Sequence, residues 1–280
     1  MAEAPPIEEF LDRWDLEFVG RPVSDRPKYP GTGDVAFVRQ GGDQLVLKTT
    51  PAGTDEERSG AVLAHWDGQG AVRVIRQGHG AVLIERAMPG NDLVDMVLNG
   101  GDEAATDILC DIMAKLKRPK PLRPHYRSIS DWSRGFGRNR DKAVGVGVPA
   151  ELIEAAQSVF MDLWVTQAIP ILLHGDLQHY NVVRDAERGW LAIDPKGILG
   201  EPAYETGAML RNPQDPDLCA DPAIIERRAR QICRRRGHAY DRVIGWCFSQ
   251  WVLSVLWAIE DNLPYAPEWL TGPLAARELL

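Results

Sequence analysis

The sequence predicts an α+β fold of two lobes, with a small antiparallel β-sheet lobe over residues 1–87 and a mainly helical lobe over residues 88–280. Short strand-like runs separated by glycine turns fill the first ninety residues. Beyond residue 90 the apolar residues recur with helical spacing, in segments 92–98, 102–116, 149–165, 222–236 and 240–262. A chain of 280 residues with 44% hydrophobic content is long enough to form two cores.

The expected sheet lobe contains two hairpins and a helix. Residues 35–39 and 44–48 alternate around a glycine turn, and residues 71–75 and 81–85 flank a second turn at 78–80. A helix is expected over residues 54–66, with Thr54 as its N-cap. The segment 117–148 is rich in Pro, Gly and Arg, and its pattern assigns it to no element.

The strongest functional signal lies between His174 and Asp194. Asp176 follows an apolar run, Asn181 comes five residues later, and Asp194 follows eighteen residues after Asp176. A kinase catalytic loop has the same order, because an Asp precedes an Asn by five residues and another Asp follows on the next hairpin. Asp176 is therefore the predicted base, which orients the acceptor hydroxyl and takes its proton. Asn181 and Asp194 offer the oxygen ligands that Mg²⁺ prefers, so the expected reaction uses ATP and Mg²⁺.

The sheet lobe supplies candidate residues for the phosphates of ATP. Lys48 lies near the end of its strand, where kinases carry a phosphate-binding lysine. Glu56 and Glu57 are both placed to pair with it from the following helix, and Glu56 is preferred. Gly31 and Gly33 are candidates for a glycine loop over the phosphates.

The end of the last strand in this lobe is the candidate site for adenine. Glu85, Arg86 and Ala87 lead from that strand into a short connector before the helical part. A connector of this kind presents backbone N–H and C=O groups to the base, so side-chain identity matters little there.

Several features favour a small cationic acceptor over a protein substrate. Gly175 stands where a protein kinase carries an Arg that reads a phosphorylated activation loop, and no long regulatory segment follows Asp194. Glu260 and Asp261 form an acidic pair at the end of an apolar helix and are predicted to bind the acceptor, with Glu205 as a further candidate. The alternative for the pair is a solvated helix end.

Three other polar residues near the loop have open alternatives. His174 is expected to brace the aspartate, and His179 either faces the metal or packs inside the fold. Lys196 either contacts phosphate or pairs with a nearby glutamate, Glu201 or Glu205.

Charge and cysteine usage limit the partners and the location. The net charge of −8 argues against nucleic acid and anionic membranes. The arginine-rich segment 227–236 is expected to be a solvated helix face. The acidic start and the lack of an eighteen-residue apolar run predict a cytoplasmic protein. The four cysteines lack metal-ligand spacing and fit a reducing compartment. We expect a monomer or a weak dimer.

Taken together, residues 173–183, 189–197, 200–205 and 210–213 resemble the aminoglycoside/hydroxyurea antibiotic-resistance kinase family, whose best-known members are streptomycin 6-phosphotransferases. The resemblance implies a protein-kinase-like fold and transfer of phosphate from ATP to a hydroxyl of a streptomycin-type aminoglycoside. It also implies that the Trp-x-x-Glu-Asp element ending at Asp261 lies near the acceptor. The alternatives are a kinase for hydroxyurea or a sugar-like metabolite, and a pseudokinase that only binds nucleotide. A mere binder needs no proton acceptor, so the presence of Asp176 argues against a pseudokinase.

Overall fold

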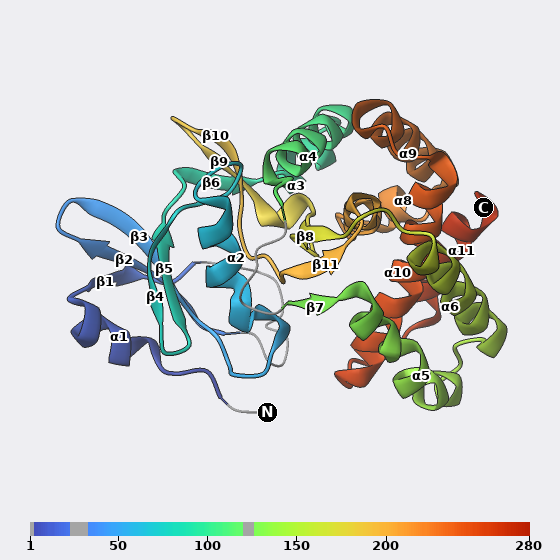
Figure 1. Ribbon diagram of the computed structural model, residues 1–280, viewed down its shortest axis with the longest axis horizontal. Coiled ribbons are helices and arrows are strands. Elements are labelled where there is room, and N and C mark those ends of the chain that lie inside the picture. Colours follow the sequence, from blue (N-terminus) through green and yellow to red (C-terminus); the bar gives the residue numbers. More distant parts are fainter. Residues whose placement is uncertain (1–2, 23–32, 120–125) are drawn as a thin grey trace. The chain divides into compact units, whose positions relative to one another are not determined.

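The computed structural model describes residues 3–22, 33–119 and 126–280 (Figure 1). The chain divides into two compact units. Unit 1 contains Met1–Asp92 and Asn181–Gly197, and unit 2 contains Leu93–Tyr180 and Ile198–Leu280. The sequence-based division at residue 87 is contiguous and therefore differs from these units, because the hairpin within Asn181–Gly197 pairs with a strand of unit 1.

A five-stranded antiparallel sheet forms most of unit 1, in the order β1-β2-β3-β5-β4. Its strands are β1 (Glu17–Gly20), β2 (Val35–Gln40), β3 (Asp43–Thr49), β4 (Val74–Gly78) and β5 (Ala81–Glu85). Helix α1 (Ile7–Trp14) turns three apolar side chains, Ile7, Phe10 and Trp14, into the core with residues of β2, β3 and β5. These side chains recur at helical spacing, so one face of α1 is apolar.

The first predicted hairpin is confirmed, and two other predictions for unit 1 need correction. Lys48 pairs with Val35 across β2 and β3. The strand expected over 71–75 begins later, at Val74. The helix expected over 54–66 starts as a 3-10 turn, η1 (Asp55–Arg58), and continues as α2 (Ser59–Trp66). Thr54 does not cap it through its side chain, because its hydroxyl donates to the Pro51 carbonyl at 2.8 Å.

A second sheet in unit 1 has three strands, in the order β10-β9-β6. Its members are β6 (Pro89–Asp92), β9 (Val182–Asp185) and β10 (Gly189–Ala192). Strands β9 and β10 form the hairpin predicted between Asn181 and Asp194, in antiparallel register from Val182↔Ala192 to Asp185↔Gly189. The hairpin therefore brings the two ends of this segment together.

Unit 2 is mainly helical, with a small sheet in the order β7-β11-β8 (Figure 1). The strands of this sheet are β7 (Arg127–Ser128), β8 (Ile171–Leu173) and β11 (Ile198–Gly200). The longer helices are α4 (Asp102–Leu116), α5 (Ile129–Gly145), α6 (Ala150–Val165), α9 (Pro222–Arg236) and α10 (Tyr240–Glu260). The shorter helical segments are α3 (Val94–Leu98), η2 (His179–Asn181), η3 (Pro202–Glu205), α7 (Thr206–Leu210), α8 (Pro216–Cys219), η4 (Pro267–Leu270) and α11 (Thr271–Glu278).

Helix α10 is the central helix of unit 2 and packs against α5, α6, α7 and α11. By length and composition it could cross a membrane, with a mean hydropathy of 1.4, but 78% of that window is buried inside the structure. Trp246 of α10 meets Phe160 and Tyr204 edge to face, and the three ring centroids lie 4.9 to 6.1 Å apart. Its apolar character is thus explained by its place in the core.

The segment 117–148, which the sequence left unassigned, contains helix α5. A capping box begins this helix, since the Ser128 N–H donates to Asp131 Oδ2 at 2.8 Å. Serine followed three residues later by an acid is the sequence signature of such a start. The segment is therefore helical from Ile129 to Gly145, although the helix contains three glycines.

The arginines of α9 fit the expectation of a solvated face only in part, because Arg230, Arg234 and Arg235 are exposed whereas Arg228 is buried. Arg228 is only 1% exposed and binds the Asp102 carboxylate at the start of α4, with Nη2 to Oδ1 at 2.6 Å. One turn later Gln231 donates to Asp107 at 2.8 Å, and Arg235 contacts Asp111. Part of the polar face of α9 is thus paired with acids of α4, the helix against which α9 packs.

Candidate functional site

The predicted base lies on a loop that follows β8 in unit 2. Gly175 has φ +83°, in the left-handed region that favours glycine. The Asp176 N–H donates to His174 Nδ1 at 3.3 Å, and His174 is fully buried. His174 therefore braces the aspartate, as the sequence predicted, and reaches it through the backbone.

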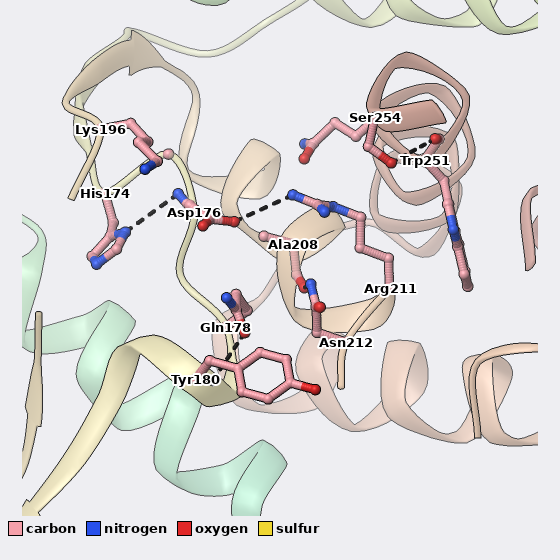
Figure 2. A network of polar contacts seen from close by, with 12 residues as sticks. His174, Asp176, Gln178, Tyr180, Lys196, Ala208, Arg211, Asn212, Trp251 and Ser254 are labelled. Atoms are coloured by element: carbon pink, nitrogen blue, oxygen red, sulfur yellow. Dashed lines mark hydrogen bonds and ion pairs between the residues drawn. The ribbon is translucent and has the colours of Figure 1, made fainter. Parts of the chain in front are cut away.

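The carboxylate of Asp176 contacts an arginine that the sequence did not predict as a site residue. Figure 2 shows Asp176 between His174 and Arg211, with Arg211 Nη2 at 3.3 Å from Asp176 Oδ1. The Asp176 side chain is 24% exposed, so it is accessible to an acceptor. Arg211 lies in the stretch 210–213, which carries part of the family resemblance, and that was the signal for it in the sequence.

The prediction that Glu205 binds the acceptor is wrong, because this residue is buried and accepts hydrogen bonds from the backbone of the loop that carries Asp176. Its Oε1 accepts the Gly175 N–H at 2.8 Å, and its Oε2 accepts the His174 N–H at 2.9 Å. Only 4% of the residue is exposed. Burial raises the pKa of Glu205 to about 7, although these two backbone hydrogen bonds lower it in part. Glu205 thus holds the backbone just before Asp176.

Glu205→Gln is expected to remove a pH dependence from the stability of the fold. Because its folded pKa of about 7 exceeds the ordinary 4.5, the stability from protonated Glu205 is full below 4.5 and is lost as the pH rises through about 7. Between about pH 5 and about pH 8 this loss amounts to about 2–3 kcal/mol. Urea unfolding at both pH values should show that wild type loses this much more stability than the variant.

The exposed Glu151 on α6 provides the control, since Glu151→Gln should retain the wild-type pH dependence. If the free energy of unfolding changed with pH by the same amount in wild type and in Glu205→Gln, the account of Glu205 would be contradicted. The variant should also have lower turnover, because one carboxamide oxygen replaces two carboxylate acceptors for the His174 and Gly175 N–H groups.

Asn181 and Asp194, the predicted metal ligands, lie at adjoining points in unit 1. The Ile193 N–H donates to the Asn181 carbonyl at 2.9 Å, so the open end of the β9–β10 hairpin sets Asp194 beside Asn181. Asp194 has φ +58°, a strained conformation for a residue with a side chain. Such strain is typical of functional positions.

This pair of residues fits a magnesium ion that is completed by phosphate oxygens. Both side chains supply hard oxygen donors, and Mg²⁺ in nucleotide sites commonly uses one or two protein ligands together with phosphates. Over residues 3–22, 33–119 and 126–280, no group of three or more His, Cys, Asp or Glu side chains could hold a metal. An ion here would therefore take its remaining ligands from the nucleotide and water.

Lys48 pairs with Glu56, the glutamate that the sequence analysis preferred. Lys48 Nζ lies 2.6 Å from Glu56 Oε2, and both side chains are largely buried. The same ammonium group contacts the Asp194 carboxylate. Glu57 instead accepts the Gly53 N–H at 3.0 Å, on the exposed side of the turn. The pairing with Glu56 is thus observed, whereas the role of the pair toward ATP stays a prediction.

The two candidate glycines differ in what the structure describes. Gly31 lies outside the described residues. Gly33 is buried, and a Cβ atom added to it would lie 1.5 Å from the Thr49 carbonyl oxygen. Close approach to β3 therefore requires glycine at position 33, whatever its part in phosphate binding.

Two of the three residues proposed to present backbone groups to adenine already use their N–H groups in the sheet. Glu85 donates to the Arg73 carbonyl at 3.0 Å, and Arg86 donates to the Gln44 carbonyl at 3.2 Å. The Glu85 side chain accepts the Arg73 N–H at 2.8 Å. Ala87 follows at the end of the strand, so it is the one of the three residues best placed to offer its N–H to a base.

The acidic pair at the end of α10 separates into two different environments. Glu260 accepts hydrogen bonds from Arg138 at 2.6 and 2.8 Å and from Asn139 at 2.8 Å. The Arg138 hydrogen bonds hold the pKa of Glu260 below its usual value. Asp261 is exposed. Glu260 thus braces α5 against α10, and Asp261 is the better candidate for a cationic acceptor.

His179 packs inside unit 2. It is 1% exposed, and burial, together with the charge of Arg228, lowers its pKa to about 3. Neither ring nitrogen has a hydrogen-bond partner among the described residues. His179 is therefore neutral in the fold, which agrees with the packing alternative.

Comparisons with known proteins found a family and relatives that match most of this chain. Residues 25–262 match a family described as aminoglycoside/hydroxyurea antibiotic resistance kinase. The chain is 34% identical over 257 residues to streptomycin 3''-kinase from Klebsiella pneumoniae, which covers 90% of this chain and 92% of that protein. It is 27% identical over 273 residues to streptomycin 6-kinase from Streptomyces glaucescens, which covers 91% of this chain and 83% of that protein.

A solved structure supports the fold. A thermostable mutant of aminoglycoside phosphotransferase APH(4)-Ia, crystallised with ADP and hygromycin B, aligns with a TM-score of 0.62 at 14% identity and covers 98% of this chain and 96% of that chain. This likeness confirms the predicted protein-kinase-like fold, with an antiparallel sheet in the N-terminal part and helices in the C-terminal part. The family match spans most of the sequence and includes the loop of Asp176. The chain is a small-molecule phosphotransferase and belongs to the aminoglycoside/hydroxyurea antibiotic resistance kinase family.

Proposed function

We propose that the chain transfers the γ-phosphoryl group of ATP to a hydroxyl of a streptomycin-type aminoglycoside. The observation that carries this proposal is the accessible Asp176 carboxylate, which Arg211 contacts and whose loop Glu205 and His174 hold from within. A loop that is held so firmly before a single accessible carboxylate suits a group that must orient a hydroxyl.

The chemistry assigns one role to each group. Asp176 accepts the hydroxyl proton while the acceptor oxygen bonds to the γ-phosphorus and the bond from that phosphorus to the β,γ-bridging oxygen breaks, which releases ADP. Lys48, positioned by Glu56, holds the phosphates. Asn181 and Asp194 would hold Mg²⁺, which supplies positive charge against the phosphate oxygens when bound.

The proposed acceptor class rests on the relatives and on charge. Two relatives are named as streptomycin kinases, one for the 3'' position and one for the 6 position. The net charge of −8 and the exposed Asp261 suit a cationic acceptor in the cytoplasm. The sequence resemblance favoured the 6-hydroxyl, whereas the relative of higher identity is a 3''-kinase, so the product itself must decide the position.

Hydroxyurea is the second candidate acceptor, because the family description includes it. Streptomycin, hydroxyurea and a neutral sugar should be incubated with the enzyme, ATP and Mg²⁺, and the products analysed by mass spectrometry and NMR. We expect a monophosphorylated streptomycin whose NMR spectrum identifies the 3'' or the 6 position. Phosphorylation of hydroxyurea alone would replace the aminoglycoside proposal, and the absence of any acceptor product would contradict both.

Asp261→Asn is expected to raise KM for a cationic acceptor by roughly 2- to 5-fold, because an exposed ion pair contributes up to about 1 kcal/mol. KM for ATP should stay unchanged. Steady-state kinetics with each substrate varied in turn measure both constants. Glu268→Gln, an exposed acid on η4, is the matched control and should leave both constants as in wild type. Unchanged acceptor KM in Asp261→Asn would remove Asp261 from the acceptor site.

A further inference from the structure

Lys196 has a partner that neither alternative from the sequence included. Its Nζ lies 2.5 Å from Glu56 Oε1, and the other oxygen of the same carboxylate binds Lys48 at 2.6 Å. Glu201 and Glu205, the partners considered from the sequence, belong to unit 2 and bind other groups there. Glu56 is thus shared by two lysines, one on each of its oxygens.

The turn that carries Lys196 fixes it near the proposed metal ligand. Asp194 and Gly197 both have positive φ values, +58° and +70°, with Pro195 between Asp194 and Lys196. Lys196 Nζ lies 3.9 Å from Asp194 Oδ2. The Lys196 side chain is 21% exposed and the Lys48 side chain is 13% exposed, so neither is fully buried.

The formal charges of these four side chains favour an anion once Asp194 engages a metal. Lys48 and Lys196 together carry two positive charges, which Glu56 and Asp194 balance in the structure. If Asp194 gives its oxygens to Mg²⁺, the two lysines keep one shared carboxylate between them. A pair of ammonium groups with one carboxylate, beside a divalent ion, is a site for a polyphosphate.

We propose that Lys196 is a second phosphate-binding residue, which shares Glu56 with Lys48 and contacts the phosphates of the nucleotide. The inference rests on the proposed function, because it assumes that this cluster receives ATP. Lys48 and Lys196 reach Glu56 from different strands and turns of unit 1, so one glutamate sets the position of both cations. A lysine that acted only through Glu56 and Lys48 would make no contact with the phosphates, so bound ATP would not shield its ammonium group from a reagent.

The test measures how affinity depends on the number of phosphates. Calorimetry should compare adenosine, AMP, ADP and ATP, each with Mg²⁺, for wild type, Lys196→Met and Lys196→Arg. We expect Lys196→Met to weaken ATP binding by roughly 10- to 100-fold and adenosine binding hardly at all, because a charged hydrogen bond is lost. Lys196→Arg should recover part of the ATP affinity. Lys115→Met, on the exposed face of α4, is the control and should match wild type.

If Lys196→Met left the ratio of the ATP affinity to the adenosine affinity as in wild type, the proposal would be overturned. If wild type itself bound ATP no better than adenosine, the proposed function would fail first, and the two failures are thereby distinguished.

A measurement on wild type covers the case in which Lys196→Met does not fold. Acylation by a lysine-reactive reagent, followed by peptide mass spectrometry, should show Lys196 protected by ATP with Mg²⁺ and unprotected by adenosine, while Lys115 reacts equally in both. Equal reactivity of Lys196 with the two ligands would contradict phosphate contact.

Discussion

Asp176→Asn should lower kcat by roughly 10²–10⁴ while the affinity for ATP stays close to that of wild type. The carboxamide has nearly the shape of the carboxylate and can still accept a hydrogen bond from Arg211, but it cannot take the acceptor proton. The backbone contacts of the loop with Glu205 do not involve the side chain of residue 176, so the loop should keep its conformation. Turnover and nucleotide calorimetry of the purified variant measure both parts.

Asp141→Asn provides the matched control for this experiment. Asp141 lies in the same unit and its side chain is fully exposed, so its amide variant should keep wild-type kcat. If Asp176→Asn retained more than about a tenth of the wild-type kcat, the assignment of Asp176 as the base would be wrong.

Asp194→Ala should reduce turnover by roughly 10²–10⁴ and, unlike the change at Asp176, should also weaken Mg²⁺-dependent nucleotide binding. The physical reason is that a metal ligand acts in both the ground state and the transition state. In the structure Asp194 also contacts Lys48 and lies 3.9 Å from Lys196. Its loss therefore leaves more positive charge for phosphates, and binding without Mg²⁺ should not fall. Calorimetry with and without Mg²⁺ separates these two effects.

Asp43→Ala, at the exposed first residue of β3, is the control in unit 1 and should behave as wild type. If Asp194→Ala bound nucleotide as tightly as wild type at saturating Mg²⁺, Asp194 would be a structural turn residue and Asn181 would lose its proposed partner.

Local patterns in the sequence were sufficient to predict several parts of the site. Alternation of side chains in a hairpin placed Lys48 on its strand, and the first turn of the next helical segment contained its partner, Glu56. The hairpin between Asn181 and Asp194 was predicted from two short apolar runs that flank a turn. These predictions succeeded because each depends on residues that are close in the sequence or in one strand register.

The parts that the sequence did not predict depend on contacts between distant segments. Glu205 is 30 residues from the Gly175 N–H that it accepts, and Glu260 is 122 residues from Arg138. Arg211 is 35 residues from Asp176. Residue type alone does not distinguish an acid that is buried against backbone N–H groups from an acid that is accessible to a cation. Only the fold distinguishes them, through burial and the partners it supplies.

The most direct test of the central claim, that Asp176 catalyses phosphoryl transfer from ATP to an acceptor hydroxyl, follows the fate of the γ-phosphoryl group. Wild type and Asp176→Asn should be mixed with γ-labelled ATP, Mg²⁺ and streptomycin, and the label should be traced by chromatography over a single turnover. The account predicts that wild type places the label on the antibiotic in step with ADP formation, and that the variant does so at least about a hundredfold more slowly. Label that appeared only as inorganic phosphate, or transfer at equal rates by the two proteins, would contradict it.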